Sequence, residues 1–465
     1  MRTKKKVVIL GAGPTGLSAA YELAKLGHFD VEVVEREAEV GGIATTFRHG
    51  EFALDVGTHR LYAGMHADTL DWIRGFIGDD LLDRRRNCKI LLMDQLYRYP
   101  PKPTELLSKM GLKTPALFLA DFAMAKARGD LDLSTYEGHM VQRFGRYFYD
   151  IFYRPYAEKV WGLPMSKLSS DQAQKRVNAL SMKDVVVKTM TRKIVRPNYF
   201  YPKSGMGYIW DRVAEELSRL GVTIHRSTSV VGFSRSGNRV RSVVVEHGAG
   251  QQELPCDELM TTIPLTRFLG GVFTTDSVTR LAGGLRYRAL VVFYLVLAKP
   301  FASEHETYYV PSTEFPFNRV FEPKNYSPSL GPRGRTCLGL EITCDVGDET
   351  WRMSDSDRLE QVLPGLAKLG LVRRDEVTEC FSKRIETAYP LYEVGYRDTL
   401  TRLLSEAQKL ENAISNGRQG LFIHQNIHHS IEMGQAAARH VASGSPSSVW
   451  YSSAIRAFDA FKVFD

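Results

Sequence analysis

The sequence predicts an α/β fold with a Rossmann-like lobe assembled from separated segments, a helical insertion and an antiparallel-sheet substrate domain. The first observation is an apolar, β-branched run at residues 7–10 that leads directly into Gly11-Ala12-Gly13-Pro14-Thr15-Gly16. The second is a helical pattern from 17 to about 25, followed by another apolar run at 31–34 that ends in Glu35. Strand, glycine turn, helix, strand and acid in this order are typical of a dinucleotide-binding site.

Each residue type of the glycine turn has a physical role at such a site. Gly11 permits the tight turn, Gly13 lets the backbone approach a pyrophosphate, and Gly16 lets the helix pack closely on the strand. The helix begins at Pro14-Thr15, where free N–H groups and the positive dipole end attract phosphate. Glu35 can accept both hydroxyl groups of a ribose. An ordinary glycine turn is the alternative, but the flanking strand and helix patterns favour the dinucleotide site.

The domain organisation follows from the way these patterns change along the chain. At 465 residues the chain is too long for one simple core, so two or three lobes are expected. We assign 1–65, 199–264 and 396–445 to the nucleotide-binding lobe. Residues 66–198 show mainly helical spacing, and 265–395 alternate strands with turns as an antiparallel sheet does. The tail, 446–465, has no role that the sequence reveals.

The remaining elements are predicted from apolar periodicity and from turn residues. Helices are expected at 69–76, 104–107, 116–127, 136–149, 171–180, 208–220, 354–369, 399–414 and 430–443. Strands are expected at 222–224, 238–245, 259–263, 290–297, 307–310, 336–343 and 420–423.

Composition excludes several classes of protein. The chain is 43% hydrophobic and 25% charged, and it has no apolar stretch near the roughly 18 residues that span a bilayer. A basic start that leads into a strand and a glycine turn is not typical of a signal peptide. Five scattered cysteines, without metal-ligand spacing, favour a reducing cytoplasm. The net charge of +8 fits a solvated surface or an anionic substrate, because no long basic stripe with interleaved aromatics indicates nucleic acid.

A second glycine pair connects the nucleotide site with a known superfamily. Glu35-x5-Gly41-Gly42 resembles the extended fingerprint of the flavoproteins that include amine oxidases, protoporphyrinogen oxidases and UDP-galactopyranose mutases. This resemblance implies FAD as the cofactor, with the paired glycines beside its pyrophosphate and ribityl chain. It also implies further contacts to FAD from Arg36, Gly57, Thr58, His59, Val231, Arg418 and Met433.

Several segments, in the same order and with near-correct spacing, resemble the UDP-galactopyranose mutase branch. They are 154–164 (RPYAEKVWGLP), 175–177 (KRV), 201–210, 315–328 and 417–434. The resemblance implies an enzyme that interconverts the pyranose and furanose rings of a nucleotide sugar without net redox change. Reduced flavin acts as the nucleophile in that branch, so a covalent intermediate divides one difficult step into two easier ones.

The resemblance assigns roles to residues outside the cofactor motif. Arg176 and Arg319 fall where the family binds the diphosphate, a role that suits the bidentate guanidinium group. His59 falls on the loop that faces the flavin, and with the two arginines it forms the candidate catalytic set. Tyr389 and Tyr392 resemble the tyrosines opposite the arginines. The alternatives are structural ion pairs, a structural histidine and core aromatics.

The base-binding side is less well defined by the resemblance. Phe152 falls where the family stacks uracil, Trp161 lies nearby, and Asn426 lies in a segment on the substrate side. A pair of core aromatics is again the alternative. Four residues depart from the family pattern on this nucleotide and sugar side, which puts UDP-galactose itself in doubt: Ala157, Asn318, His424 and His428.

The leading hypothesis is a cytoplasmic FAD enzyme that acts on a nucleotide diphosphate sugar, with a pyranose/furanose mutase as the best single guess. NAD(P)H is a candidate source of the reducing electrons. The alternative is an FAD-dependent oxidoreductase of the amine oxidase or protoporphyrinogen oxidase type. A non-catalytic flavin-stabilised scaffold is a third class. We expect no metal site, because no acid or cysteine accompanies His424, His428 and His429, and the oligomeric state stays open.

Overall fold

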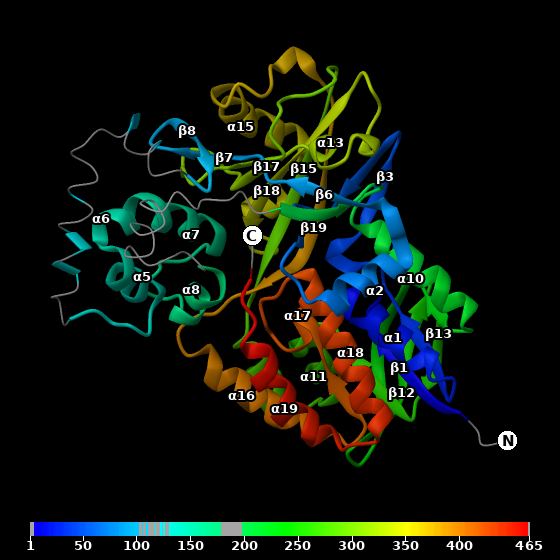
Figure 1. Ribbon diagram of the computed structural model, residues 1–465. Helices are drawn as coiled ribbons and strands as arrows, with labels where there is room; N and C mark the ends of the chain where they lie inside the picture. Colours follow the sequence, from blue (N-terminus) through cyan, green and yellow to red (C-terminus); the bar gives the residue numbers. More distant parts are fainter. Residues whose placement is uncertain are drawn as a thin grey trace.

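The nucleotide-binding lobe is built on a parallel sheet whose strands come from distant parts of the chain (Figure 1). The computed structural model describes residues 4–101, 130–177 and 198–463, with isolated residues between 102 and 129. The five-stranded sheet has the order β10-β2-β1-β14-β20, with bounds Thr223–His225, Phe29–Val34, Lys5–Leu10, Glu258–Thr261 and Ala413–Ser415. All four pairings are parallel. The α/β fold with a lobe assembled from separated segments is therefore confirmed.

Helices cover this sheet because its central strand is apolar on both faces. Residues 7–10 of β1 are fully buried, as a continuous apolar run in a parallel sheet requires. Helices α1 (Pro14–Lys25) and α18 (Ile427–Ser443) pack against each other. A Cβ built on Gly434 would lie 2.4 Å from the carbonyl oxygen of Thr15, so the two helices approach too closely for any larger residue.

A seven-stranded sheet forms the core of the second lobe. Its order is β19-β15-β18-β17-β16-β7-β8, with bounds Val377–Pro390, Tyr287–Leu297, Thr336–Cys344, Arg319–Phe321, Thr307–Tyr309, Cys88–Leu92 and Gln95–Tyr99. All pairings are antiparallel except β16 with β7. The segment 66–198, predicted as mainly helical, also contains strands that the sequence did not predict. Its strands β7 and β8 join this sheet because Ile90 and Tyr97 pack against Tyr309.

The helical cluster lies beside that sheet. It contains α5 (Tyr136–Phe144), α6 (Arg146–Phe148), a π-helical turn (Tyr149–Tyr153), α7 (Arg154–Trp161) and α8 (Ser170–Arg176). The helix predicted at 136–149 is present in two pieces, and the one predicted at 171–180 is described as far as α8. The helices predicted at 104–107 and 116–127 lie mainly outside the described residues.

The remaining elements have the following bounds. The helices are α2 (Ala67–Ile77), α10 (Gly207–Arg219), α11 (Leu265–Val272), α12 (Asp276–Ala282), α13 (Pro323–Tyr326), α14 (Glu349–Arg352), α15 (Asp355–Lys368), α16 (Tyr396–Ala407), α17 (Gly417–Gly420) and α19 (Ser447–Asp459). The strands are β3 (Thr46–His49), β4 (Phe52–Asp55), β5 (Leu61–Tyr62), β6 (Leu81–Arg85), β9 (Asn198–Pro202), β11 (Thr228–Ser236), β12 (Arg239–His247) and β13 (Gly250–Pro255).

Two predictions near the end of the chain are wrong. The edge strand β20 at 413–415 includes the last two residues of the helix predicted at 399–414, and residues 417–420 form the short helix α17. The predicted strand at 420–423 does not form, because the Ser415 hydroxyl donates to the Gly420 carbonyl at 2.6 Å and turns the chain back. The tail is also ordered into a helix, α19.

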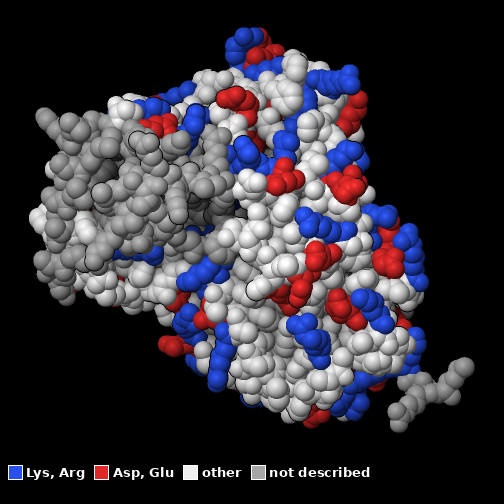
Figure 2. All heavy atoms as spheres, viewed as in Figure 1, with Lys and Arg blue, Asp and Glu red and all other residues white. Residues whose placement is uncertain are grey.

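The surface carries both signs of charge. On the face in Figure 2, lysine and arginine side chains are interspersed with acidic ones over the described residues, as a solvated surface requires. Of the helices in the described part of the chain, none is long and apolar enough to cross a membrane.

Candidate functional site

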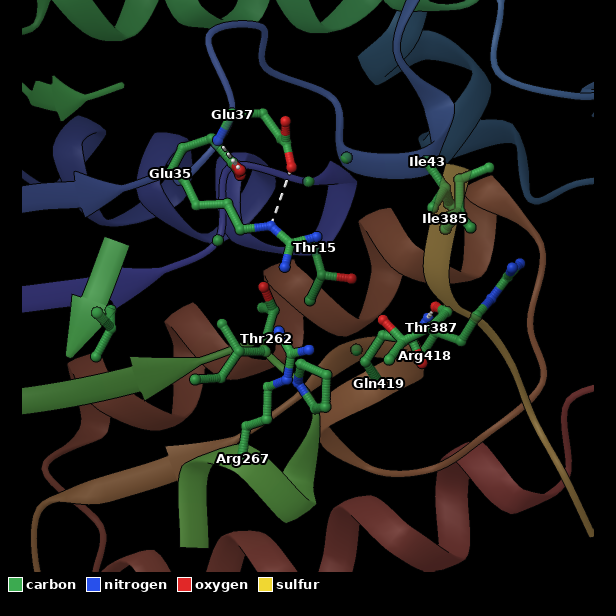
Figure 3. Close-up of a pocket in the computed structure, with 18 of the residues that line it drawn as sticks. Thr15, Glu35, Glu37, Ile43, Thr262, Arg267, Ile385, Thr387, Arg418 and Gln419 are labelled. Atoms are coloured by element: carbon green, nitrogen blue, oxygen red, sulfur yellow. Dashed lines mark hydrogen bonds and ion pairs between the residues drawn. The ribbon is translucent and has the colours of Figure 1, made fainter. Parts of the chain in front are cut away.

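A cavity of about 810 Å³ lies at the carboxyl ends of β1, β2 and β14, the position where open α/β sheets bind ligands. In Figure 3, Glu35 lies toward one end of this cavity, Arg418 toward the other, and Thr15 between them. Nine predicted cofactor residues line it: Gly11, Gly13, Thr15, Glu35, Arg36, Gly42, His59, Val231 and Arg418. Its volume is in the range of about 300 to 1,000 Å³ that is usual for cofactor sites.

The glycine turn has the geometry that a dinucleotide cradle needs. Gly11 has φ +102° and its N–H donates to the Val34 carbonyl at 2.8 Å. A Cβ on Gly16 would lie 2.0 Å from the carbonyl oxygen of Gly11, so only glycine permits this helix–strand contact. The second glycine pair lies against the first, since a Cβ on Gly42 would be 3.3 Å from the Cα of Gly13. The backbone therefore forms an open cradle without side chains in it.

Glu35 is positioned by backbone groups at the end of β2. Its two carboxylate oxygens accept from the N–H groups of Ala12, at 2.8 Å, and Glu37, at 3.0 Å. Burial raises the pKa of Glu35, and these two hydrogen bonds oppose the shift. Glu35 is thus a nearly buried carboxylate beside the glycine turn, and its role in binding ribose hydroxyls stays a prediction.

The loop after β4 brings His59 to the other end of the cavity. Burial and then the Arg418 charge lower the pKa of His59 to about 4, so the ring is neutral at pH 7. Its Nδ1 atom is buried and has no partner among the described residues. A second, smaller cavity shares His59 and Arg418 with the first and is also lined by Gly57 and Thr58. An orphaned buried nitrogen at this edge fits a polar group of a bound cofactor.

Glu341 is the site residue that the sequence did not reveal. One oxygen of its carboxylate accepts from the Thr58 N–H at 2.7 Å and from the Thr58 hydroxyl, and the other accepts from Arg319 Nε at 2.8 Å. The side chain is 1% exposed. Glu341 and Arg319 are opposite each other in the register of β17 and β18. The only local signal was an acid within the apolar strand at 336–344.

The structure brings Arg176 and Arg319 together around Tyr389. Arg319 Nη2 donates to the Tyr389 hydroxyl at 3.3 Å. The Arg176 guanidinium carbon lies 5.1 Å from the Tyr389 ring centre and 5.3 Å from that of Trp161, and its Nε has no partner in the described part of the chain. Arg418 lies 5.9 Å from the same tyrosine ring. These three cations outnumber the Glu341 carboxylate and leave a net positive charge around Tyr389, which favours an anionic ligand. Tyr389 lines the smaller cavity, whereas Arg176 and Arg319 are absent from the linings of both cavities.

Four other candidates have structural contacts of their own. Tyr392 is 1% exposed and its hydroxyl donates to the Phe422 carbonyl at 3.1 Å. Asn426 caps the N-terminus of α18. Phe152 stacks on Phe148 with ring centres 4.3 Å apart. Met433 is fully buried, and it, Pro14, Gly16 and Gly41 are absent from the cavity lining.

Of the residues that depart from the mutase pattern, His424 and Asn318 adjoin the residues around Tyr389. His424 pairs through Nε2 with the Gln172 side chain at 3.1 Å and packs beside Trp161. Asn318 is 2% exposed, and its Oδ1 has no partner among the described residues. Ala157 and His428 are buried. None of these four residues lines the cavity that contains the glycine cradle.

Comparisons with known proteins agree with this architecture. Residues 14–442 match the model of the family described as flavin containing amine oxidoreductase. The structure of a reduced UDP-galactopyranose mutase superposes with a TM-score of 0.82, at 21% identity, over 99% of this chain and 100% of that chain. A putrescine oxidase bound to putrescine gives 0.61 at 16% identity, over 95% and 99%. At these identities the likeness shows the fold alone.

Curated relatives match only in part. An L-amino-acid oxidase of Sistrurus catenatus edwardsii is 35% identical over 122 residues, which are 23% of this chain and 23% of that protein. The chain thus matches about a quarter of the length of this relative, so its activity carries over only as a proposal.

Proposed function

The chain belongs to the family of flavin-containing amine oxidoreductases, and from this premise we propose that it is an FAD enzyme acting on a nucleotide diphosphate sugar. Ring interconversion between pyranose and furanose forms is the reaction that we favour. The observation that carries the proposal is the convergence of Arg176 and Arg319 on Tyr389, beside the loop that holds His59.

The residues present fit FAD. The glycine turn and the N-terminus of α1 would hold its pyrophosphate, Glu35 its ribose, and the loop at 57–59 its ring end. Bound reduced FAD would supply the nucleophile of a mutase reaction. Bound oxidised FAD would instead supply a hydride acceptor.

The chain's own groups fit a diphosphate leaving group. Arg176 has an unpaired Nε and no carboxylate partner among the described residues, so it can pair phosphate oxygens without breaking an ion pair. Arg319 is oriented by Glu341 and lies within hydrogen-bonding reach of Tyr389. His59 is neutral and can accept or donate one hydrogen bond at Nδ1.

The alternative is an amine or amino-acid oxidase, and the match to an L-amino-acid oxidase favours it. A cationic amine needs no guanidinium partner and the carboxylate of an amino acid needs only one, which is why we rank the oxidase second. Oxygen uptake separates the two, since a mutase needs a reductant to start but consumes none per turnover. Steady oxygen consumption with release of hydrogen peroxide would decide for the oxidase.

The test of the leading function is nucleotide binding by Arg176→Ala. Loss of a charged hydrogen bond of about 1.5 to 3 kcal/mol should raise the Kd for UDP about ten- to hundredfold, with FAD content unchanged. Arg286→Ala is the matched control, because that arginine is half exposed and pairs with Asp345 and Glu393 at the surface. Titration of the FAD-loaded protein with UDP, followed by fluorescence, measures both. UDP binding by Arg176→Ala at wild-type affinity would rule the proposal out.

A further inference from the structure

Residues 460–463 run from the end of α19 to the end of α8. The carboxylate of Asp459 bridges two cations there. Its Oδ1 lies 3.0 Å from Lys175 Nζ, and its Oδ2 accepts from Arg397 at 3.2 and 3.3 Å. Arg397 also pairs with Asp171, at the other end of α8. Since Lys175 is 5% exposed, its charge depends on this carboxylate.

The chain after Asp459 adds contacts to the same helix end. The Val463 N–H donates to the carbonyl of Lys175 at 3.0 Å, and Lys462 Nζ donates to the carbonyl of Gln174 at 3.0 Å. The Phe461 ring stacks on His429 of α18, with ring centres 4.1 Å apart. In Figure 1 this red segment rises from α19 toward α8 and ends at the label C. It satisfies carbonyl groups that the end of a helix otherwise leaves without partners.

Arg176 is the next residue after Lys175 and the last residue of α8. A helix of seven residues is too short to be stable by itself, so tertiary contacts must fix its end. We propose that residues 459–463, the C-terminal strap, hold the end of α8 and thereby place Arg176 over Trp161 and Tyr389. Asp459 is the positioning residue of the strap. The identity of the ligand that Arg176 then binds rests on the proposed function.

The experiment compares Asp459→Asn with Asp398→Asn in the full-length, FAD-loaded protein. Asp398 is exposed at the start of α16, so its variant controls for the change in charge. Hydrogen exchange at the amides of 172–177 should become at least tenfold faster in Asp459→Asn only, while exchange in α1 stays unchanged. The Kd for UDP should rise about tenfold at constant FAD content, and Asp459→Glu should restore part of the affinity.

A double-mutant cycle separates positioning from general destabilisation. In the Arg176→Ala background, Asp459→Asn should change the Kd for UDP by less than twofold, because the residue that it positions is gone. Unchanged hydrogen exchange at the amides of 172–177, or additive effects of the two substitutions on the Kd for UDP, would contradict the proposed role of the C-terminal strap. A wild-type protein that does not bind UDP would instead contradict the proposed function. The hydrogen-exchange measurement would still show whether the C-terminal strap holds the end of α8.

Discussion

Single buried groups determine the electrostatics around Tyr389. Glu341 is the clearest case, because one carboxylate holds both the loop at Thr58 and the guanidinium of Arg319. Burial opposes the charge of Arg319, while the Glu341 carboxylate raises its pKa well above the usual range. Glu341 therefore fixes the orientation of Arg319 beside Tyr389, while Arg176 has no carboxylate partner among the described residues and keeps its full charge for a ligand.

We expect Glu341→Gln to destabilise the protein by about 2 to 3 kcal/mol, because a buried cation loses its counter-charge while the amide can still accept one hydrogen bond. Glu51→Gln, at the exposed pair with Arg335, should change stability by less than about 0.5 kcal/mol. Urea unfolding of both variants measures the difference. Equal urea midpoints for the two variants would show that the hydrogen bonds of Glu341 to Thr58 and Arg319 do not stabilise the contact between the loop and β17.

At the scale of elements, the glycine cradle makes the sharpest prediction. Gly16→Ala should cost about 1 to 3 kcal/mol and lower the FAD content, since the added methyl meets the carbonyl oxygen of Gly11 at 2.0 Å. Gly75→Ala, inside α2 with nothing within 4 Å of the new Cβ, should be neutral or stabilising. Thermal unfolding and the flavin absorbance of purified protein give both readouts. Full FAD content in Gly16→Ala would contradict the packing argument.

Elements with strong local signals were predictable from the sequence. Strand β1, helix α1 and helix α10 were expected from periodicity and glycine position, and the structure has them within a few residues. The strands β7 and β8 were missed because their stability comes from distant partners in the second sheet. The site divides in the same way. The glycine cradle is local in sequence, whereas Glu341 reaches the loop at Thr58 only through the register of β17 and β18.

For the molecule as a whole, buried histidines couple stability to pH. Burial, followed by the nearby His66, lowers the pKa of His428 to about 4, and burial, followed by His428, lowers that of His429 to about 3. Both rings are neutral in the folded state, whereas in the unfolded chain they take up protons below about pH 6.5. Their contribution to stability is therefore complete above pH 6.5 and is lost as pH falls toward 4. Asp55 has the opposite effect on stability. Burial raises its pKa to about 6, so the folded state binds this proton more tightly than the unfolded chain as the pH falls.

We therefore expect the free energy of unfolding to fall between pH 7.5 and pH 5.0, and His428→Gln to remove part of that fall. A ring whose pKa is near 4 when folded accounts for about 1 to 2 kcal/mol at pH 5. His28→Gln is the control for the substitution itself, since His28 is exposed. Urea midpoints at the two pH values measure each slope. A slope in His428→Gln equal to that of wild type would mean that the packing of α18 tolerates the proton, and that acid instability arises at other groups.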